Sequence, residues 1–155
     1  MIGKRILLDT TYLLPFFKIP IDVGRFERAQ FKKILAHYTS IHFAEISLYE
    51  VKAKLVRLKK KTKVNDTIFE AFWHNWTVLR EDPKFIIEPY QEGIDKNLNV
   101  ISSRFLSLDV FDSLILATAM KVGTVLTEDE DIHGVKSDVF FKNLRILSWT
   151  DFKMV

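Results

Sequence analysis

The chain has 155 residues, of which 48% are hydrophobic and 28% are charged, so we expect one packed domain rather than disorder. It contains no cysteine, which excludes disulfide scaffolds, thiolate metal sites and thiol catalysis. The longest apolar run, 114–120, is far shorter than the ~20 residues that span a bilayer. We therefore expect a cytoplasmic protein without membrane association.

Positive charge is concentrated in one short segment. Residues 51–63 hold seven Lys or Arg and no acid, whereas the rest of the chain has a net charge of −4 and the whole chain one of +3. A basic segment on a mildly acidic chain indicates a polyanionic partner.

Strand-like and helical patterns alternate along the chain. The strand-like runs are 4–8, 40–43, 84–87, 123–126 and 144–148, and the helical patterns between them are 22–38, 47–62, 65–80, 90–104 and 109–122. This alternation predicts an α/β fold, with a parallel sheet covered by helices on both faces. Ligands of such sheets bind beyond the carboxyl ends of the strands, so the residues there are the candidates for a site.

Asp9 ends the first predicted strand. Asp is a good N-cap, so a structural role at the start of a helical turn is as plausible as a functional one.

Glu50 lies early in the basic helical segment. It follows Ser47 by three residues, the spacing of a capping box, and it is four residues before Lys54, the spacing of a surface ion pair. The helical period also places Glu50 on one face with Lys54, Arg57 and Lys61. A nucleic-acid backbone could follow these three basic residues, so we predict them to bind nucleic acid.

Two further acids open the helical pattern 109–122. Asp109 suits an N-cap, because the helix dipole favours negative charge there. Asp112 enters a stretch that is apolar nearly all round, and a buried carboxylate needs a cation, a metal or a raised pKa.

The run 127–131 (TEDED) places four acids after the fourth predicted strand, where a solvated acidic loop is the structural alternative. With Asp9, Glu50 and Asp112, this run predicts several carboxylates at one sheet edge. A positive charge is needed to offset the repulsion between these carboxylates, and oxygen ligands of this kind select Mg²⁺ or Mn²⁺. Such ions beside a basic helix suit phosphodiester hydrolysis.

The chain resembles the PIN-domain ribonucleases, especially toxins of the VapC type and their archaeal relatives, in four segments that follow the family's order. These are ILLDTTYLL (6–14), ISLYEVKAKL (46–55), FDSLILATAM (111–120) and VLTEDEDI (125–132), and the final LRILSWTDF resembles the family's closing strand and tail. The segments place the family's acids on Asp9, Glu50, Asp112 and Asp129, while Asp109 and Asp131 are additional acids close to the last two.

The resemblance implies a three-layer α/β/α fold with a five-stranded parallel sheet over 1–155, to which 60–83 adds a helical elaboration. It implies an endoribonuclease that uses Mg²⁺ or Mn²⁺, often a homodimer, and an antitoxin protein as partner if the chain is a toxin. In this interpretation Asp9 and Asp112 hold the principal ion, Asp129 supports a second ion or its waters, and Glu50 positions the attacking water. Thr10 and Thr127 are candidate donors to these acids.

Other sequence patterns give weaker evidence of function. The histidines have no zinc-binding spacing, and the aromatic stripe of Phe69, Phe72, Trp73 and Trp76 fits core packing or a partner surface better than base stacking. A phosphatase of the haloacid dehalogenase type needs a second Asp two residues after the first, where this chain has Thr11. The main alternative function is a non-catalytic RNA-binding or scaffold module with the same fold.

Overall fold

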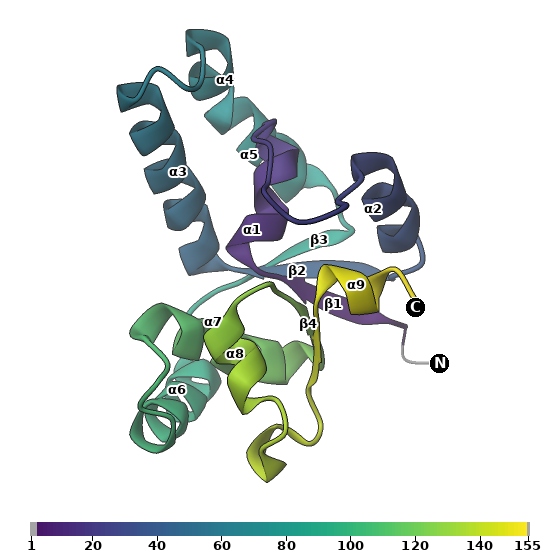
Figure 1. Cartoon of the computed structure of the whole chain (residues 1–155), viewed down its shortest axis with the longest axis vertical. Helices are drawn as coiled ribbons and strands as arrows, with labels where there is room; N and C mark the ends of the chain where they lie inside the picture. Colours follow the sequence, from purple (N-terminus) through teal and green to yellow (C-terminus); the bar gives the residue numbers. More distant parts are fainter. Residues whose placement is uncertain (1–2, 155) are drawn as a thin grey trace.

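A computed structural model describes residues 3–154 of the chain (Figure 1). Five parallel strands form one sheet in the order β3-β2-β1-β4-β5. The strands are β1 (Arg5–Leu8), β2 (Ser40–Ala44), β3 (Phe85–Glu88), β4 (Thr124–Leu126) and β5 (Arg145–Leu147). All five predicted strands are present within about one residue of their expected ends, and the predicted α/β class is confirmed.

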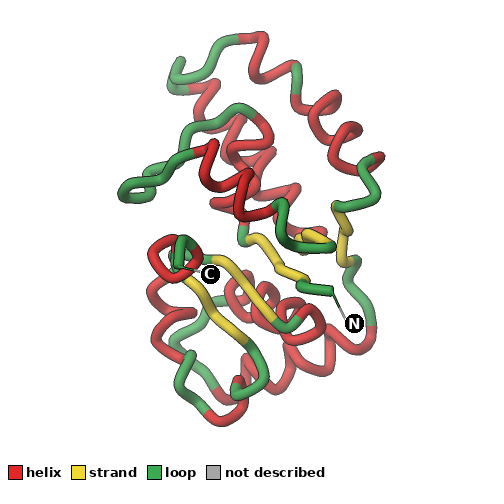
Figure 2. The backbone as a smooth tube through the Cα atoms, turned by 90° about the vertical axis from the view of Figure 1, so that its right-hand side faces the viewer, coloured by secondary structure: helices red, strands yellow, loops and turns green. Residues whose placement is uncertain are grey.

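Helices cover both faces of this sheet (Figure 2). One face carries α6 (Glu92–Arg104), α7 (Val110–Val122), α8 (Glu130–Val135) and the 3-10 turn η2 (Val139–Phe141). The other face carries α1 (Thr10–Leu13), η1 (Leu14–Phe17), α2 (Arg28–Leu35), α3 (Glu45–Lys60), α4 (Asp66–Glu70), α5 (Phe72–Glu81) and α9 (Trp149–Phe152). The architecture is therefore the three-layer α/β/α arrangement that the resemblance implied.

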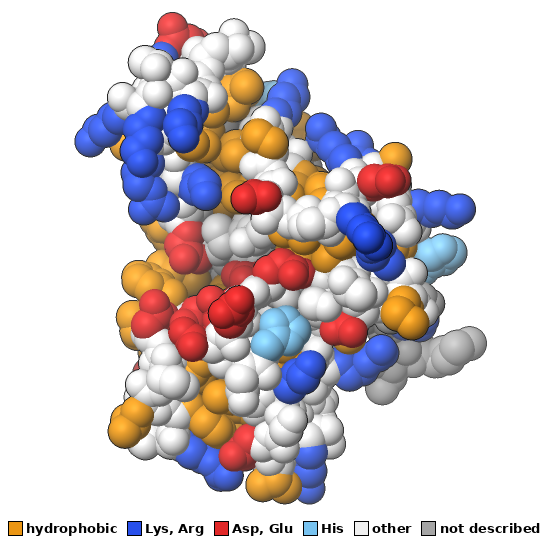
Figure 3. Space-filling model, viewed as in Figure 1, with side chains coloured by type: hydrophobic (Ala, Val, Ile, Leu, Met, Phe, Trp, Pro, Cys, Tyr) orange, Lys and Arg blue, Asp and Glu red, His pale blue; other side chains and the backbone are white. Residues whose placement is uncertain are grey.

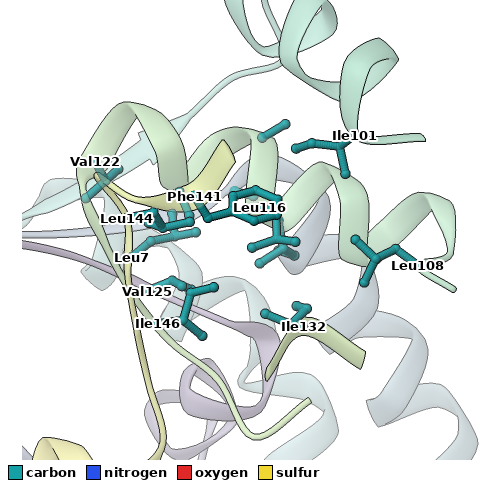
Figure 4. Packing of buried hydrophobic residues seen from close by; sticks show 14 of the residues in the cluster. Leu7, Ile101, Leu108, Leu116, Val122, Val125, Ile132, Phe141, Leu144 and Ile146 are labelled. Carbon is teal, nitrogen blue, oxygen red and sulfur yellow. The ribbon is translucent and has the colours of Figure 1, made fainter. Parts of the chain in front are cut away.

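The two-residue period of the strands divides the core between these layers. Leu7 packs in the cluster under α6 and α7, whereas its neighbours Ile6 and Leu8 pack in the cluster under α2 and α9. Val125 and Ile146 join Leu7, as Figure 4 shows. Strands buried on both faces read as continuous apolar runs, which is why the sequence pattern located them.

The cap residues fix the ends of α7, which forms much of the site described below. Asp109 begins the helix by accepting hydrogen bonds from the backbone N–H groups of Phe111 and Asp112, each at 2.8 Å, so the predicted N-cap is confirmed. Gly123 ends it with φ 99°, a left-handed conformation that side-chain-bearing residues rarely adopt.

Two predicted helices differ from the structure. The pattern 22–38 contains only α2, because the preceding segment is irregular and Arg25 has φ 59°. The pattern 65–80 forms two helices separated at Ala71, which divides the predicted aromatic stripe. Phe69, Phe72 and Trp76 pack against the core, but the Trp73 side chain is 66% exposed.

A buried polar network links β2, β3 and α7. The Glu88 carboxylate accepts a hydrogen bond from the Lys121 ammonium at 2.5 Å and lies 2.7 Å from Nδ1 of His42. Nε2 of His42 lies 2.7 Å from the Ser40 hydroxyl. Burial alone would raise the pKa of Glu88, but the bonds to Lys121 and His42 outweigh it and lower that pKa.

Among residues 3–154, the structure contains no helix with both the length and the apolar character needed to cross a membrane.

Candidate metal and nucleic-acid site

Acidic side chains from four segments meet at the carboxyl ends of β1, β2 and β4. Figure 3 shows them as a band across the middle of one face, below the Lys and Arg side chains of α3. The parallel sheet produces this meeting, because the carboxyl ends of its strands share one edge. The predicted acids Asp9, Glu50, Asp112 and Asp129 all contribute.

Asp9 follows β1 and is held on both carboxylate oxygens. Oδ1 accepts a hydrogen bond from the Thr10 backbone N–H and Oδ2 accepts one from the Thr127 hydroxyl, both at 2.6 Å. The pKa of Asp9 is raised to about 6, mainly by burial and also by the charges of Glu50 and Asp129, while the two hydrogen bonds from Thr127 and Thr10 act in the opposite direction. Asp9 is also the N-cap of α1, so the structural and the functional interpretations are compatible.

Glu50 reaches the site from α3. Its carboxylate accepts a hydrogen bond from the Thr10 hydroxyl at 2.5 Å, which places it beside Asp9. The predicted capping box is wrong, because α3 begins at Glu45 with Ala44 as N-cap, and the Ser47 hydroxyl has no hydrogen-bond partner in the described chain. The alternative ion pair is absent too: among residues 3–154 no ion pair joins Glu50 to Lys54.

Asp112 stands in the first turn of α7. Burial raises its pKa to about 6, together with the charges of Asp129, Asp109 and Asp9. The Asp109 carboxylate caps the helix by accepting from the Phe111 and Asp112 backbone N–H groups. Its negative charge also contributes to the raised pKa of Asp112.

Asp112, Asp129 and Asp131 form the tightest acidic group. One carboxylate oxygen from each lies within 4.8 Å of the others, a separation that a single cation could bridge. Asp129 is the N-cap of α8 and accepts a hydrogen bond from the Ile132 N–H at 2.9 Å, which fixes its side chain. Asp131 lies in the first turn of the same helix, and its two-residue spacing from Asp129 is the sequence signal that could have ranked it among the site residues.

The acids of this site have no basic side chain paired with them among residues 3–154. Within the described part of the chain, none of Asp9, Glu50, Asp112, Asp129 and Asp131 forms an ion pair. The donor set is all carboxylate oxygen, with no His or Cys, which is the chemistry that suits a hard divalent cation.

The predicted basic residues Lys54, Arg57 and Lys61 are all exposed, and none of the three is in an ion pair within residues 3–154. The helix dipole accounts for part of their placement, since α3 has Glu45 in its first turn and basic residues in its last. Lys54 also lines a hollow of about 460 Å³ that includes Thr11, which connects the basic face of α3 to the turn after Asp9.

The family model described as PIN domain matches residues 6–137. The chain belongs to the PIN-domain family. The predicted membership is therefore confirmed. Members of this family are nucleases, so the membership supports a nuclease as the class of enzyme. No curated protein matches the chain by sequence.

Several solved structures share the fold of this chain. VapBC2 from Rickettsia felis, bound to a DNA fragment from its promoter, has a TM-score of 0.62 at 15% identity, covering 94% of this chain and 98% of that one. PAE2754 from Pyrobaculum aerophilum has a TM-score of 0.61 at 15% identity, with 99% and 95% covered. FitAcB from Neisseria gonorrhoeae has a TM-score of 0.60 at 19% identity, with 92% and 96% covered. At these identities the likeness establishes the fold.

Proposed function

We propose that this PIN-domain protein is an endoribonuclease that uses Mg²⁺ or Mn²⁺ to hydrolyse RNA phosphodiester bonds. One observation carries the proposal: oxygens of Asp112, Asp129 and Asp131 lie within 4.8 Å of one another, with no ion pair to a protein cation in the described chain. Carboxylates held this close are stabilised by a cation from outside the protein.

The resemblance implied that Asp9 and Asp112 hold the principal ion; in this proposal Asp112, Asp129 and Asp131 hold it, and Asp9 lies beside them. Asp131 extends the set expected from the sequence. A bound divalent ion lowers the pKa of water and offsets the charge of the reacting phosphate. The hydrogen bonds from Thr10 and Thr127 keep the Asp9 carboxylate in a fixed orientation, and the Thr10 hydroxyl positions Glu50 to hold the attacking water and accept its proton.

The basic face of α3 supplies the contacts to RNA. Lys54, Arg57 and Lys61 are exposed, and Lys and Arg side chains over α3 lie on the same face of the molecule as the acidic band (Figure 3). They attract the phosphate backbone, while the acidic group that Glu50 of the same helix adjoins marks where cleavage occurs.

We also propose that the protein is the toxin of a toxin–antitoxin pair, acts in the cytoplasm and forms a homodimer, with 1–155 as one nuclease unit elaborated at 60–83. The similar structures named above include VapBC2, and another is titled as a toxin–antitoxin complex from Klebsiella pneumoniae. The exposed aromatic rings of Tyr49 and Trp73 line one hollow between α3 and α5, and Tyr49 also lines a second hollow beside α6 and α7, which supports a protein partner on this face.

The test is cleavage of varied single-stranded RNAs with Mg²⁺ or Mn²⁺ by the wild type, Asp9→Asn and Glu130→Gln, with a chelator control. We expect Asp9→Asn to lower the rate about 100-fold or more, because several kcal/mol of charge stabilisation depend on the carboxylate set. Glu130 is exposed and should matter little.

Two outcomes would overturn the proposal. Activity that survives Asp9→Asn would place the reaction elsewhere. Folded, cation-loaded wild-type protein that cleaves no RNA of the panel would favour the RNA-binding or scaffold module.

A further inference from the structure

The four acids of the run 128–131 face different surroundings. Asp129 and Asp131 face Asp112, and Glu130 is exposed with no hydrogen bond to its side chain in the described chain. The Glu128 side chain turns the other way, toward α1 and α9. The sequence alone could not separate these roles.

We propose that Glu128 is a positioning residue: it binds no metal itself, but it fixes the loop between β4 and α8 so that Thr127 and Asp129 stand at the cation site. This inference rests on the proposed metal-dependent function, and it adds a residue that acts on the site through its neighbours.

Glu128 is anchored to two buried groups. Its Oε1 accepts hydrogen bonds from the Tyr12 hydroxyl and, at 2.5 Å, from the backbone N–H of Trp149. Tyr12 is 0% exposed and Trp149 is 1% exposed. Rings of Phe26 and Phe31 pack against both of them, so the partners of Glu128 are rigid.

The residues on either side of Glu128 point into the site. Glu128 is exposed and bonded to α1 and α9, whereas Thr127 is buried. Successive residues of an extended segment project to opposite sides, so a side chain fixed toward α1 and α9 directs its neighbours to the other side. Thr127 donates to Asp9 at 2.6 Å and accepts from the Asp129 N–H at 3.1 Å, and Asp129 joins the group with Asp112. By bonding to α1 and α9, Glu128 therefore fixes where Thr127 and Asp129 lie in the site.

Other bonds also hold this loop, so losing Glu128 should loosen it rather than unfold it. The Thr127 N–H donates to the Leu147 carbonyl at 3.0 Å, and the Thr127 carbonyl lies 2.9 Å from Nε2 of His133. Asp129, two residues beyond Thr127, is held by the bond from its N–H to Thr127 and by two bonds within α8, from the Ile132 N–H to its side chain and from the His133 N–H to its carbonyl.

The competing explanation is charge alone, since any acid near a cation site strengthens cation binding. Two substitutions separate the explanations. Glu128→Gln removes the charge but keeps a side-chain oxygen that can accept both hydrogen bonds. Glu130→Ala removes a charge from the same run without removing a described hydrogen bond.

The experiment measures Mn²⁺ affinity by electron paramagnetic resonance for the wild type, Glu128→Ala, Glu128→Gln, Glu130→Ala and Tyr12→Phe. We expect Glu128→Ala to weaken binding about 10-fold or more, as loss of groups that orient metal ligands does. Glu128→Gln and Glu130→Ala should stay within about threefold of the wild type, and Tyr12→Phe, which removes one of the two donors, should fall between.

If Glu128→Gln weakened Mn²⁺ binding as much as Glu128→Ala does, the charge of Glu128 would explain the effect and the proposal would be overturned. The same conclusion would follow if Glu130→Ala weakened Mn²⁺ binding as much as Glu128→Ala does. Near-ultraviolet circular dichroism checks folding, and if Glu128→Ala does not fold, unchanged affinity in Tyr12→Phe overturns the proposal instead. Wild-type protein that binds no Mn²⁺ would contradict the proposed function itself, which distinguishes the two failures.

Discussion

The acids at the carboxyl ends of β1 and β4 differ from Glu88, at the end of β3, in what balances their charge. Glu88 is buried but bonded to Lys121 and His42, and its pKa is lowered. Asp9 is also largely enclosed, yet it has neutral donors and acidic neighbours, and its pKa is raised to about 6. The same chain thus contains a carboxylate with its own cations and a group of carboxylates without any, which is the difference between a structural network and a site for an external ion.

The largest expected effect is that two matched substitutions change the free energy of unfolding in opposite directions. Without divalent cations near pH 7.5, Asp9→Asn should raise the free energy of unfolding by about 1 to 3 kcal/mol, because it removes a charge that the folded state disfavours. Glu88→Gln should lower it by about 2 to 4 kcal/mol, because His42 and Lys121 lose a charged partner. Urea denaturation measures both.

Glu130→Gln is the matched control for these two variants, since exposed substitutions usually change stability by less than about 0.5 kcal/mol. A loss of stability in both Asp9→Asn and Glu88→Gln would mean that the acidic group is balanced within the protein.

The pH dependence sharpens the same comparison. Asp9 titrates near 6 in the folded chain and near about 3.9 when unfolded, so the folded state retains its proton longer as pH rises. Cation-free stability should therefore fall by roughly 2 kcal/mol between about pH 4 and pH 7 through this group. Glu88 acts in the opposite direction: its contribution is present above about pH 4.3 and is lost as pH falls below that value.

The quantity to measure is the difference in unfolding free energy between wild type and Asp9→Asn at each pH, in chelator and in excess Mg²⁺. Magnesium should flatten the difference, because it supplies the missing positive charge. A difference that does not change between pH 4 and pH 7 in chelator would refute a raised pKa at Asp9.

The smallest expected effect concerns the basic face of α3. Reversing the charges of Lys54, Arg57 and Lys61 together should weaken RNA binding about 10-fold near 0.1 M salt, and it should flatten the salt dependence by up to about 0.7 in logarithmic slope per lost phosphate contact. Fluorescence anisotropy with labelled single-stranded RNA measures both quantities.

The control for that variant reverses Arg28, Lys32 and Lys33, which are exposed on α2, away from α3 (Figure 1). Equal loss of affinity in the two triple variants would mean that RNA senses only the net charge of the protein.

The sequence predicted those parts of the fold that depend on long apolar patterns. Strands β1, β2 and β4 were found because they are apolar on both faces, and α7 because Asp109 and Gly123 mark its ends. The segments α1, α8, α9, η1 and η2 were not predicted, because elements of three to six residues show no periodicity.

The candidate site was predictable as a set of acids but not as a geometry. The ends of β1 and β4 brought Asp9 and Asp129 to one edge, as parallel topology requires, and the start of α7 brought Asp112 there. The close approach of Asp131 to Asp112 depends on how α8 packs against α7, and the network of Glu88 joins residues 33 and 46 positions apart. Such contacts depend on register and packing, which residue patterns do not specify.

The central claim is that the acidic group is a divalent cation site. The most direct measurement is an anomalous difference map from crystals of the wild-type protein soaked in Mn²⁺. We predict a peak at about 2.1 Å from carboxylate oxygens of Asp112 and Asp129, the distance typical of small hard cations, and no such peak in crystals of Asp112→Asn. A map with no peak at these acids, or with a peak only elsewhere on the molecule, would contradict the claim.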